Sequence, residues 1–144
     1  MPPVTLLGQA VDLALVQELP LFGMPIKAGF PSPADDWQEG KIDLNQFLVK
    51  HPAATYLLRV SGSSMKNAGI TEGDILVVDC SLEAKHRDII IANVDGEMTV
   101  KRLHKTAKRM ALIPENDDYG PIEITSGIEF SIWGVVKHVI KNLT

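Results

Sequence analysis

Residues 88–103, DIIIANVDGEMTVKRL, carry the clearest structural signal in this chain. Two runs rich in apolar and β-branched residues, 88–94 and 97–103, flank the dipeptide Asp95-Gly96. Asp-Gly tolerates the positive φ angles of a two-residue type I′ turn, which makes it a strong hairpin signal. The sequence therefore predicts two antiparallel strands joined by this turn.

The same alternation of strands and turns extends on both sides of the hairpin. Further strands are predicted at residues 56–60, 74–79, 109–113, 121–124 and 130–140. Many short strands at this spacing are typical of a compact, barrel-like or sandwich β-domain. The fold class is therefore predicted to be mostly β.

One short helix is predicted before the strands. Asp43 can cap its N-terminus, with Gln46 in the reciprocal capping-box position. Leu44, Phe47 and Leu48 then fall on one face of the helix. The His51-Pro52 dipeptide is expected to end it, because the residue before a proline disfavours helical geometry.

The first 40 residues differ from the rest of the chain. They hold six of the nine prolines: Pro2, Pro3, Pro20, Pro25, Pro31 and Pro33. Proline removes a backbone donor and favours extended geometry in its predecessor. We therefore interpret residues 1–40 as an extended, mobile N-terminal arm and residues 41–144 as a β-rich domain.

Composition limits the classes of function. With 45% hydrophobic and 22% charged residues, 144 residues can form one folded domain with a real core. The net charge of −4 argues against a direct nucleic-acid surface, and the basic residues between 101 and 109 are read as a solvated hairpin. The single Cys80 excludes an internal disulfide and fits a reducing compartment. The N-terminus does not read as a signal peptide and no apolar run is long enough to span a bilayer, so we expect a cytoplasmic protein without membrane contact.

The segment Ser61-Gly62-Ser63-Ser64-Met65 is the strongest candidate for chemistry. A serine on a tight turn after a strand can project its hydroxyl while neighbouring backbone N–H groups face an oxyanion. On spacing alone, an ordinary Ser/Gly turn is the simpler interpretation. A nucleophilic serine also needs a base.

Three kinds of residue in this sequence could supply that base. The histidines at 51, 86, 104 and 138 are scattered and form no triad motif, and with one cysteine they leave no zinc-ligand spacing, so neither metal nor cofactor is expected. Ser63 and Lys66 match an S-x-x-K motif, but the glycines on either side leave no room for the helix that this motif requires. The third source is Lys101.

Lys101 lies on the predicted hairpin. Pairing across the Asp-Gly turn sets Val94 opposite Glu97 and Ile90 opposite Lys101, on a largely apolar face. Burial there would lower the lysine pKa and favour the neutral amine that accepts a proton, although Asp88 would oppose this shift if it were close. A lysine that extends to water fits the same register.

Taken together, these residues resemble the LexA/UmuD family of self-cleaving Ser-Lys proteases (peptidase S24). The resemblance runs from Leu19 to the C-terminus, and its segments occur in the family's order. They include AGFPSP (28–33), IDLNQ (42–46), SGSSM (61–65), TVK (99–101) and WGVV (133–136). It implies a LexA/signal-peptidase-like β-domain with an extended N-terminal arm.

The resemblance also implies the site. The family's nucleophile falls on Ser64, its general base on Lys101, and its scissile bond between Ala28 and Gly29. Relatives often carry cysteine where this chain has Ala28, and an acidic residue where it has Ser63. Cutting after residue 28 would leave 144 − 28 = 116 residues.

The resemblance finally implies the biology. Self-cleavage is expected to be stimulated by a RecA filament on single-stranded DNA. The trimmed homodimer is expected to act with a UmuC-type Y-family DNA polymerase in translesion synthesis during the SOS response. The alternative is a dimeric polymerase-manager binding module in which proteolysis is dispensable. A LexA-type repressor is disfavoured because residues 1–40 are too short and proline-rich for a helix-turn-helix domain, and a signal peptidase because it needs a membrane.

Overall fold

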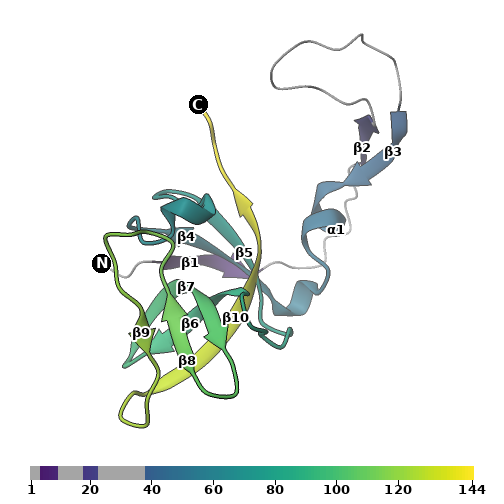
Figure 1. Ribbon diagram of the computed structural model, residues 1–144. Helices are drawn as coiled ribbons and strands as arrows, with labels where there is room; N and C mark the ends of the chain where they lie inside the picture. The colour runs from purple at the N-terminus through teal and green to yellow at the C-terminus, as the bar shows by residue number, and fades with distance from the viewer. Residues whose placement is uncertain (1–3, 10–17, 23–37) are drawn as a thin grey trace.

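An eight-stranded antiparallel sheet dominates the computed structural model, which describes residues 4–9, 18–22 and 38–144. Its order is β1-β4-β5-β10-β6-β7-β8-β9 (Figure 1). The strands are β1 (Val4–Gln9), β4 (Thr55–Val60), β5 (Ile75–Asp79), β6 (Ile89–Val94), β7 (Glu97–Lys105), β8 (Met110–Ile113), β9 (Ile122–Glu123) and β10 (Phe130–Ile140). The prediction of a mostly β fold is confirmed.

The β6–β7 hairpin has the predicted register. Ile90 pairs with Lys101 and Val94 pairs with Glu97. The turn residues Asp95 and Gly96 adopt φ angles of 48° and 86°. Positive φ at both central positions is the requirement that Asp-Gly meets, so a local signal was enough to set this pairing.

Strand β10 joins the two halves of the sheet. It pairs with β6 through Phe130–Val135 and with β5 through Val135–Ile140. Two clusters of buried side chains form the core. One contains Val4, Leu58, Val60, Met65, Ile70, Leu76, Val78, Ile91 and Val100, and the other contains Ala84, Ile90, Ala92, Leu103, Leu112 and Val135. The second strand of the hairpin, β7, contributes Val100 to the first cluster and Leu103 to the second, because residues of a strand alternate between its two sides.

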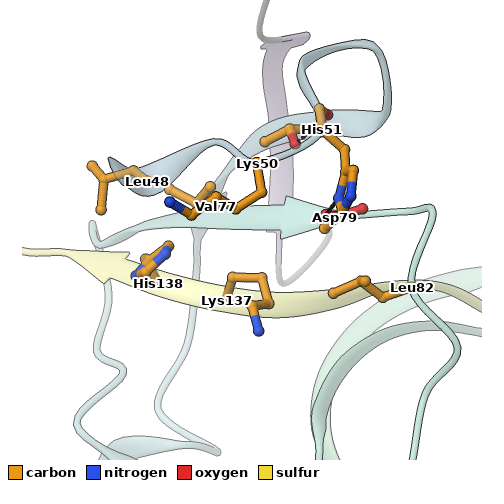
Figure 2. Close-up of a pocket in the computed structure, with 9 residues that line it drawn as sticks. Leu48, Lys50, His51, Val77, Asp79, Leu82, Lys137 and His138 are labelled. Carbon is orange, nitrogen blue, oxygen red and sulfur yellow. Dashed lines mark hydrogen bonds and ion pairs between the residues drawn. The ribbon is translucent and has the colours of Figure 1, made fainter. Parts of the chain in front are cut away.

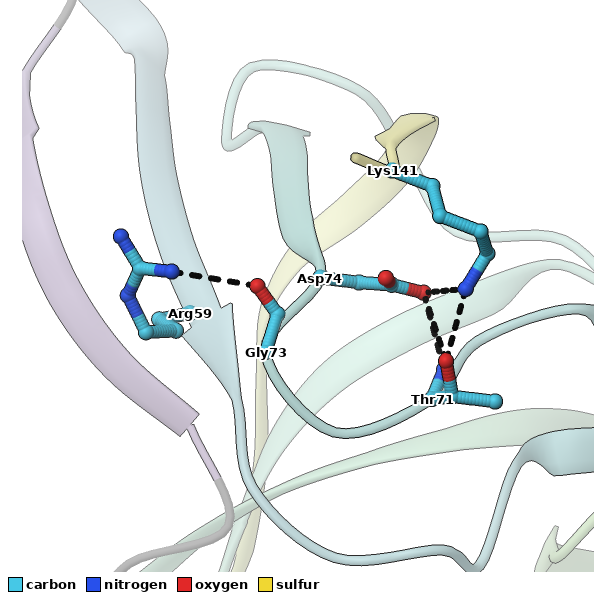
Figure 3. Close-up of polar contacts among 5 residues, drawn as sticks. All are labelled: Arg59, Thr71, Gly73, Asp74 and Lys141. Atoms are coloured by element: carbon cyan, nitrogen blue, oxygen red, sulfur yellow. Dashed lines mark hydrogen bonds and ion pairs between the residues drawn. The ribbon is translucent and has the colours of Figure 1, made fainter. Parts of the chain in front are cut away.

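The chain beyond β10 is tied back to the sheet (Figure 3). The Lys141 ammonium donates to the Asp74 carboxylate at 2.6 Å and to the Thr71 hydroxyl at 2.7 Å. Asp74 also accepts from the Thr71 backbone N–H at 2.9 Å. Burial acts most strongly on the Asp74 pKa and would raise it, but the hydrogen bonds from Lys141 and Thr71 outweigh burial and leave the pKa lowered. The buried Asp74 carboxylate therefore stays in its charged form because Lys141 and Thr71 donate hydrogen bonds to it.

Three strands near the N-terminus were not predicted. β1 pairs with β4 inside the main sheet, while β2 (Glu18–Phe22) and β3 (Gln38–Asp43) form a separate antiparallel pair. Val4 is buried in the core although it lies in the segment interpreted as an arm. No strand was predicted before residue 56, because the partner of β1 lies about 50 residues away in sequence and the prolines of the first 40 residues dominated the local pattern. The division at residue 40 stays a prediction.

The short helix is confirmed as α1 (Leu44–Leu48). Asp43 caps it by accepting the Asn45 backbone N–H at 2.9 Å. None of its residues is buried, and Leu44 and Phe47 are exposed. Figure 1 shows α1 and the β2–β3 pair to one side of the main sheet. The predicted apolar face therefore exists, but two of its three side chains are largely open to solvent in the described part of the chain.

Candidate active site

Ser64 lies on the connection between β4 and the short 3-10 helix η2 (Lys66–Ala68). The connection is tight: the Lys66 N–H donates to the Ser63 carbonyl at 3.2 Å, and Gly62 takes a φ of 93° that favours glycine. Met65 is buried in the core next to it. The half-buried Ser64 is thus held beside a fixed hydrophobic anchor.

Lys101 lies in the middle of β7 and is only 8% exposed. Its Nζ atom is 2.8 Å from the Ser64 hydroxyl oxygen and 2.8 Å from the Thr99 hydroxyl oxygen. It lies 3.1 Å from the Val100 carbonyl oxygen. The structure therefore brings together the serine and the lysine that were predicted to work as a pair, 37 residues apart in sequence.

Burial lowers the pKa of Lys101 and is the cause of the shift. Asp88 is not among the causes of the Lys101 shift, and its carboxylate accepts the Lys85 backbone N–H at 2.8 Å. A neutral amine has two N–H donors and one lone pair. Thr99 and Val100 supply two acceptors for the donors, which leaves the lone pair to accept the Ser64 hydroxyl proton. The site can thus hold the neutral lysine with every group satisfied.

The histidines contact other groups. His51 lies 2.6 Å from the Asp79 carboxylate, His86 packs edge-on against His104 at 4.8 Å, and His138 lies 6.2 Å from the Phe47 ring. The Ser81 hydroxyl donates to Asp79 at 2.6 Å. A nucleophilic serine must contact its base rather than the orienting carboxylate. This Ser-Asp-His set is therefore no triad.

A pocket of about 120 Å³ adjoins the His51–Asp79 pair (Figure 2). It lies between the α1 segment and β10. Its lining residues are Leu48, Lys50, His51, Thr55, Val77, Asp79, Leu82, Lys137 and His138. Neither Ser64 nor Lys101 lines it, so this cavity is separate from the Ser-Lys pair.

Two weaker candidates are also accounted for. Ser63 and Lys66 are both exposed, and Lys66 begins a three-residue 3-10 helix rather than lying in the α-helix that S-x-x-K chemistry requires. Burial raises the pKa of the Cys80 thiol, and the neighbouring Asp79 raises it further. A raised pKa disfavours the reactive thiolate.

In the described ranges no His, Cys, Asp and Glu side chains cluster as a metal site would need, and no helix there has the length and apolarity to cross a membrane.

Comparison with known proteins identifies the family. The family model described as peptidase S24-like matches residues 20–137, which is most of the chain. The chain belongs to the peptidase S24-like family. These proteins are self-cleaving serine peptidases, and the predicted resemblance to the LexA/UmuD family is confirmed.

Individual relatives of this S24 chain cover much of its length. It is 46% identical to "Protein MucA" of Salmonella typhimurium over 124 residues, 85% of this chain and 84% of that protein. It is 48% identical to "Protein ImpA" of Shigella flexneri over 121 residues, 84% of this chain and 82% of that protein. It is 38% identical to the "LexA repressor" of Idiomarina loihiensis over 140 residues, 96% of this chain and 66% of that protein.

Sequence reasoning missed the loop that follows β8. Asn116 is buried, and its side-chain amide donates to the Ser63 carbonyl at 2.8 Å. The segment Pro114-Glu115-Asn116-Asp117-Asp118 reads as an ordinary exposed acidic turn. No local pattern distinguishes a turn asparagine that faces solvent from one that faces another loop. The Ala28–Gly29 bond predicted as the cleavage site lies outside the described residues.

Proposed function

We propose that this chain is a serine protease that cuts its own N-terminal arm with a Ser64–Lys101 dyad. The observation that carries the proposal is the 2.8 Å separation of the Ser64 hydroxyl oxygen and the Lys101 Nζ, at a lysine whose pKa is lowered by burial. An amine of lowered pKa next to a hydroxyl is the arrangement that activates a serine without histidine.

The proposed reaction has two stages. Neutral Lys101 takes the hydroxyl proton as the Ser64 oxygen attacks the carbonyl carbon of Ala28, which gives a tetrahedral oxyanion. The Ser64 backbone N–H, which has no hydrogen-bond partner in the described part of the chain, is available to stabilise that charge. The C–N bond then breaks, and Lys101 returns the proton to the amine of Gly29. Water, deprotonated by Lys101, hydrolyses the acyl-serine and restores Ser64.

The proposed substrate is the chain's own Ala28–Gly29 bond. Small residues at both positions and prolines nearby favour an extended strand that fits a narrow cleft. Relatives from the S24 family support self-cleavage, while the choice of this bond rests on the resemblance of residues 28–33. The product would be the 116-residue chain that begins at Gly29.

The proposed biological setting is SOS mutagenesis. A RecA filament on single-stranded DNA would stimulate the cut, and the product would act as a subunit of a UmuC-type translesion polymerase in the cytoplasm. The kinship with the S24 relatives supports this setting. No direct nucleic-acid binding is proposed for this chain, in keeping with its net charge of −4.

A dimeric binding module is the second candidate function. Exposed apolar side chains favour it, because such surfaces are typical of protein contacts. They are Leu19, Leu21, Leu44, Phe47, Val139, Ile140 and Leu143.

We expect Phe47→Asp to weaken homodimerisation at least about tenfold, measured by sedimentation equilibrium. A monomeric wild-type protein at micromolar concentration would contradict the dimer.

One experiment separates the two functions. Intact protein is incubated with and without RecA bound to single-stranded DNA and ATP, and its mass is measured over time. We expect the wild type and Ser63→Ala to yield the 116-residue product, and Ser64→Ala to stay intact. Ser63 is the matched control because it is the exposed neighbour of Ser64. A Ser64→Ala protein that is cut at the same bond would exclude the dyad, and a wild type that is never cut would leave the binding module.

A further inference from the structure

The loop after β8 forms hydrogen bonds to the peptide segment that carries Ser64. The Asn116 side-chain amide donates to the Ser63 carbonyl at 2.8 Å, and the Glu115 backbone N–H donates to the Ser64 carbonyl at 2.8 Å. In return, the Asn67 backbone N–H donates to the Glu115 carbonyl at 2.8 Å. Three consecutive hydrogen bonds therefore join two loops that are about 50 residues apart in sequence.

Asn116 is the buried member of this contact, at 4% exposure, and both ends of its amide are used. Its Oδ1 accepts the Asp118 backbone N–H at 2.9 Å, while its Nδ2 donates to the Ser63 carbonyl. Because one partner is a donor and the other an acceptor, only one orientation of the amide satisfies both. The Tyr119 N–H also donates to the Asn116 carbonyl at 3.1 Å, which tightens the turn. Asn116 is thus held by hydrogen bonds within its own turn as well as by its contact to Ser63.

The same loop is attached to the strand that carries Lys101. Arg102 pairs with Ile113 across the β7–β8 ladder, so the loop starts beside the lysine. The Arg102 guanidinium forms an ion pair with the Glu115 carboxylate and donates to the Arg87 carbonyl at 2.6 Å. The residues that hold the serine loop are therefore fixed relative to the lysine, rather than to the serine loop's own strand.

We propose that Asn116 is a positioning residue, which holds the Ser63 carbonyl and so sets the Ser64 hydroxyl within reach of Lys101. This inference rests on the proposed Ser-Lys function. The serine loop needs outside support because it is a short glycine-containing turn with Ser63 exposed. A displacement of about 1 Å at a reacting group can slow a reaction about 100-fold. Asn116 touches no reacting atom; it acts through the Ser63–Ser64 peptide.

Two substitutions separate the contact to Ser63 from the internal turn. Asn116→Asp is isosteric and keeps the acceptor for the Asp118 N–H, but it replaces the donor with an oxygen. Asn116→Ser keeps a hydroxyl acceptor, adds no charge and leaves the Ser63 carbonyl without its donor. Asn67→Asp and Asn67→Ser are matched controls, because the exposed Asn67 uses only its backbone in the contact.

The measurement is the first-order self-cleavage rate of intact protein at several pH values from about 7 to about 10. We expect both Asn116 variants to cut at least about tenfold more slowly than wild type per folded molecule, with the Asn67 controls within about twofold. For the uncharged Asn116→Ser, the rate should fall by the same factor at every pH, because the lysine itself is untouched. Circular dichroism at the assay temperature gives the folded fraction.

Each other outcome has a distinct meaning. Asn116 variants that cut within twofold of wild type would overturn the inference and leave the proposed function intact. A slower rate that the unfolded fraction explains in full would also overturn it, because Asn116 would then be only structural. A wild type with no Ser64-dependent cleavage would refute the proposed function and, with it, this inference.

Discussion

Lys101 places a titratable amine where a folded protein would gain more from an apolar side chain. Its burial lowers its pKa, so the unfolded chain binds the proton more tightly than the folded chain. Stability is therefore reduced at neutral pH, and the reduction fades as pH rises towards the unfolded value of about 10.4. We interpret this loss of stability at neutral pH as a consequence of placing a general base in a buried site for the proposed self-cleavage.

The Lys101→Met substitution tests that reading. We expect self-cleavage to fall at least about 100-fold, as removal of a general base does. The free energy of unfolding of Lys101→Met relative to wild type should decrease as pH rises from about 7 to about 10, by at most about 1.4 kcal/mol per pH unit. Urea unfolding at each pH measures it, with the exposed Lys66→Met as control. If the difference in free energy of unfolding between Lys101→Met and wild type does not change with pH, the pKa of Lys101 is not lowered in the folded protein.

The pH dependence of cleavage distinguishes the lysine from a histidine base. Only neutral Lys101 accepts the Ser64 proton, and a lowered pKa places more of this form within reach of ordinary pH. We expect self-cleavage without RecA to accelerate as pH rises from about 7 towards about 10. A histidine base would reach its plateau near about 6.5. A rate that is flat above pH 7, or a Lys101→Ala protein that cuts normally, would contradict the dyad.

Among the strands, β10 depends on one glycine. Gly134 lies where the β10–β6 register shifts, and a Cβ there would lie 2.6 Å from Val78 Cγ1 and 3.3 Å from the Asp79 carbonyl oxygen. Val78 is fully buried, so it has little room to move. Close approach of two backbones is a common reason for glycine in a strand.

We expect Gly134→Ala to reduce the free energy of unfolding by about 1–3 kcal/mol, as overpacking of a core typically does. Gly127→Ala is the control, because a Cβ at Gly127 meets nothing within 4 Å. Urea unfolding followed by circular dichroism compares the two. If the two variants have the same free energy of unfolding, the added methyl group at residue 134 is accommodated by a small shift of β10 away from β5 that does not destabilise the fold.

For the molecule as a whole, the Asp74–Lys141 ion pair ties the segment after the last strand to the turn before β5 (Figure 3). We expect Asp74→Asn to reduce the free energy of unfolding at pH 7 by about 1.5–3 kcal/mol, the usual contribution of a hydrogen bond to a charged group. The Asp74 pKa is lowered, so its contribution is complete above the unfolded value of about 3.9 and is lost as pH falls below it. The deficit of the variant should therefore shrink below about pH 4.

Guanidinium unfolding at about pH 7 and about pH 3 measures this deficit. Asp117→Asn is the matched control, because Asp117 is exposed. An Asp74→Asn protein as stable as this control at pH 7 would show that the C-terminal tie contributes nothing. A deficit that persists unchanged at pH 3 would mean that the charge of Asp74 is not its cause.

Local chemistry was sufficient for those parts of the fold whose partners are near in sequence. The Asp95-Gly96 turn set the register that places Lys101 opposite Ile90, and Asp43 capped the short helix, because each depends on residues only a few positions away. Strand β10 was predicted over residues 130–140 because its apolar run is long and free of proline. Ser64 was singled out by its turn and by family resemblance, and Lys101 by register and resemblance.

Contacts between distant segments were decided only in the folded chain. β1 enters the sheet because the edge of β4 offers it hydrogen bonds and the core accepts Val4, and proline-rich flanks hid this from the sequence. The 2.8 Å approach of Ser64 to Lys101 and the Asn116 contact to Ser63 join residues 37 and 53 positions apart. Such distances depend on how two loops pack on one sheet. No local pattern encodes that packing, because a turn has the same sequence whether it faces water or another loop.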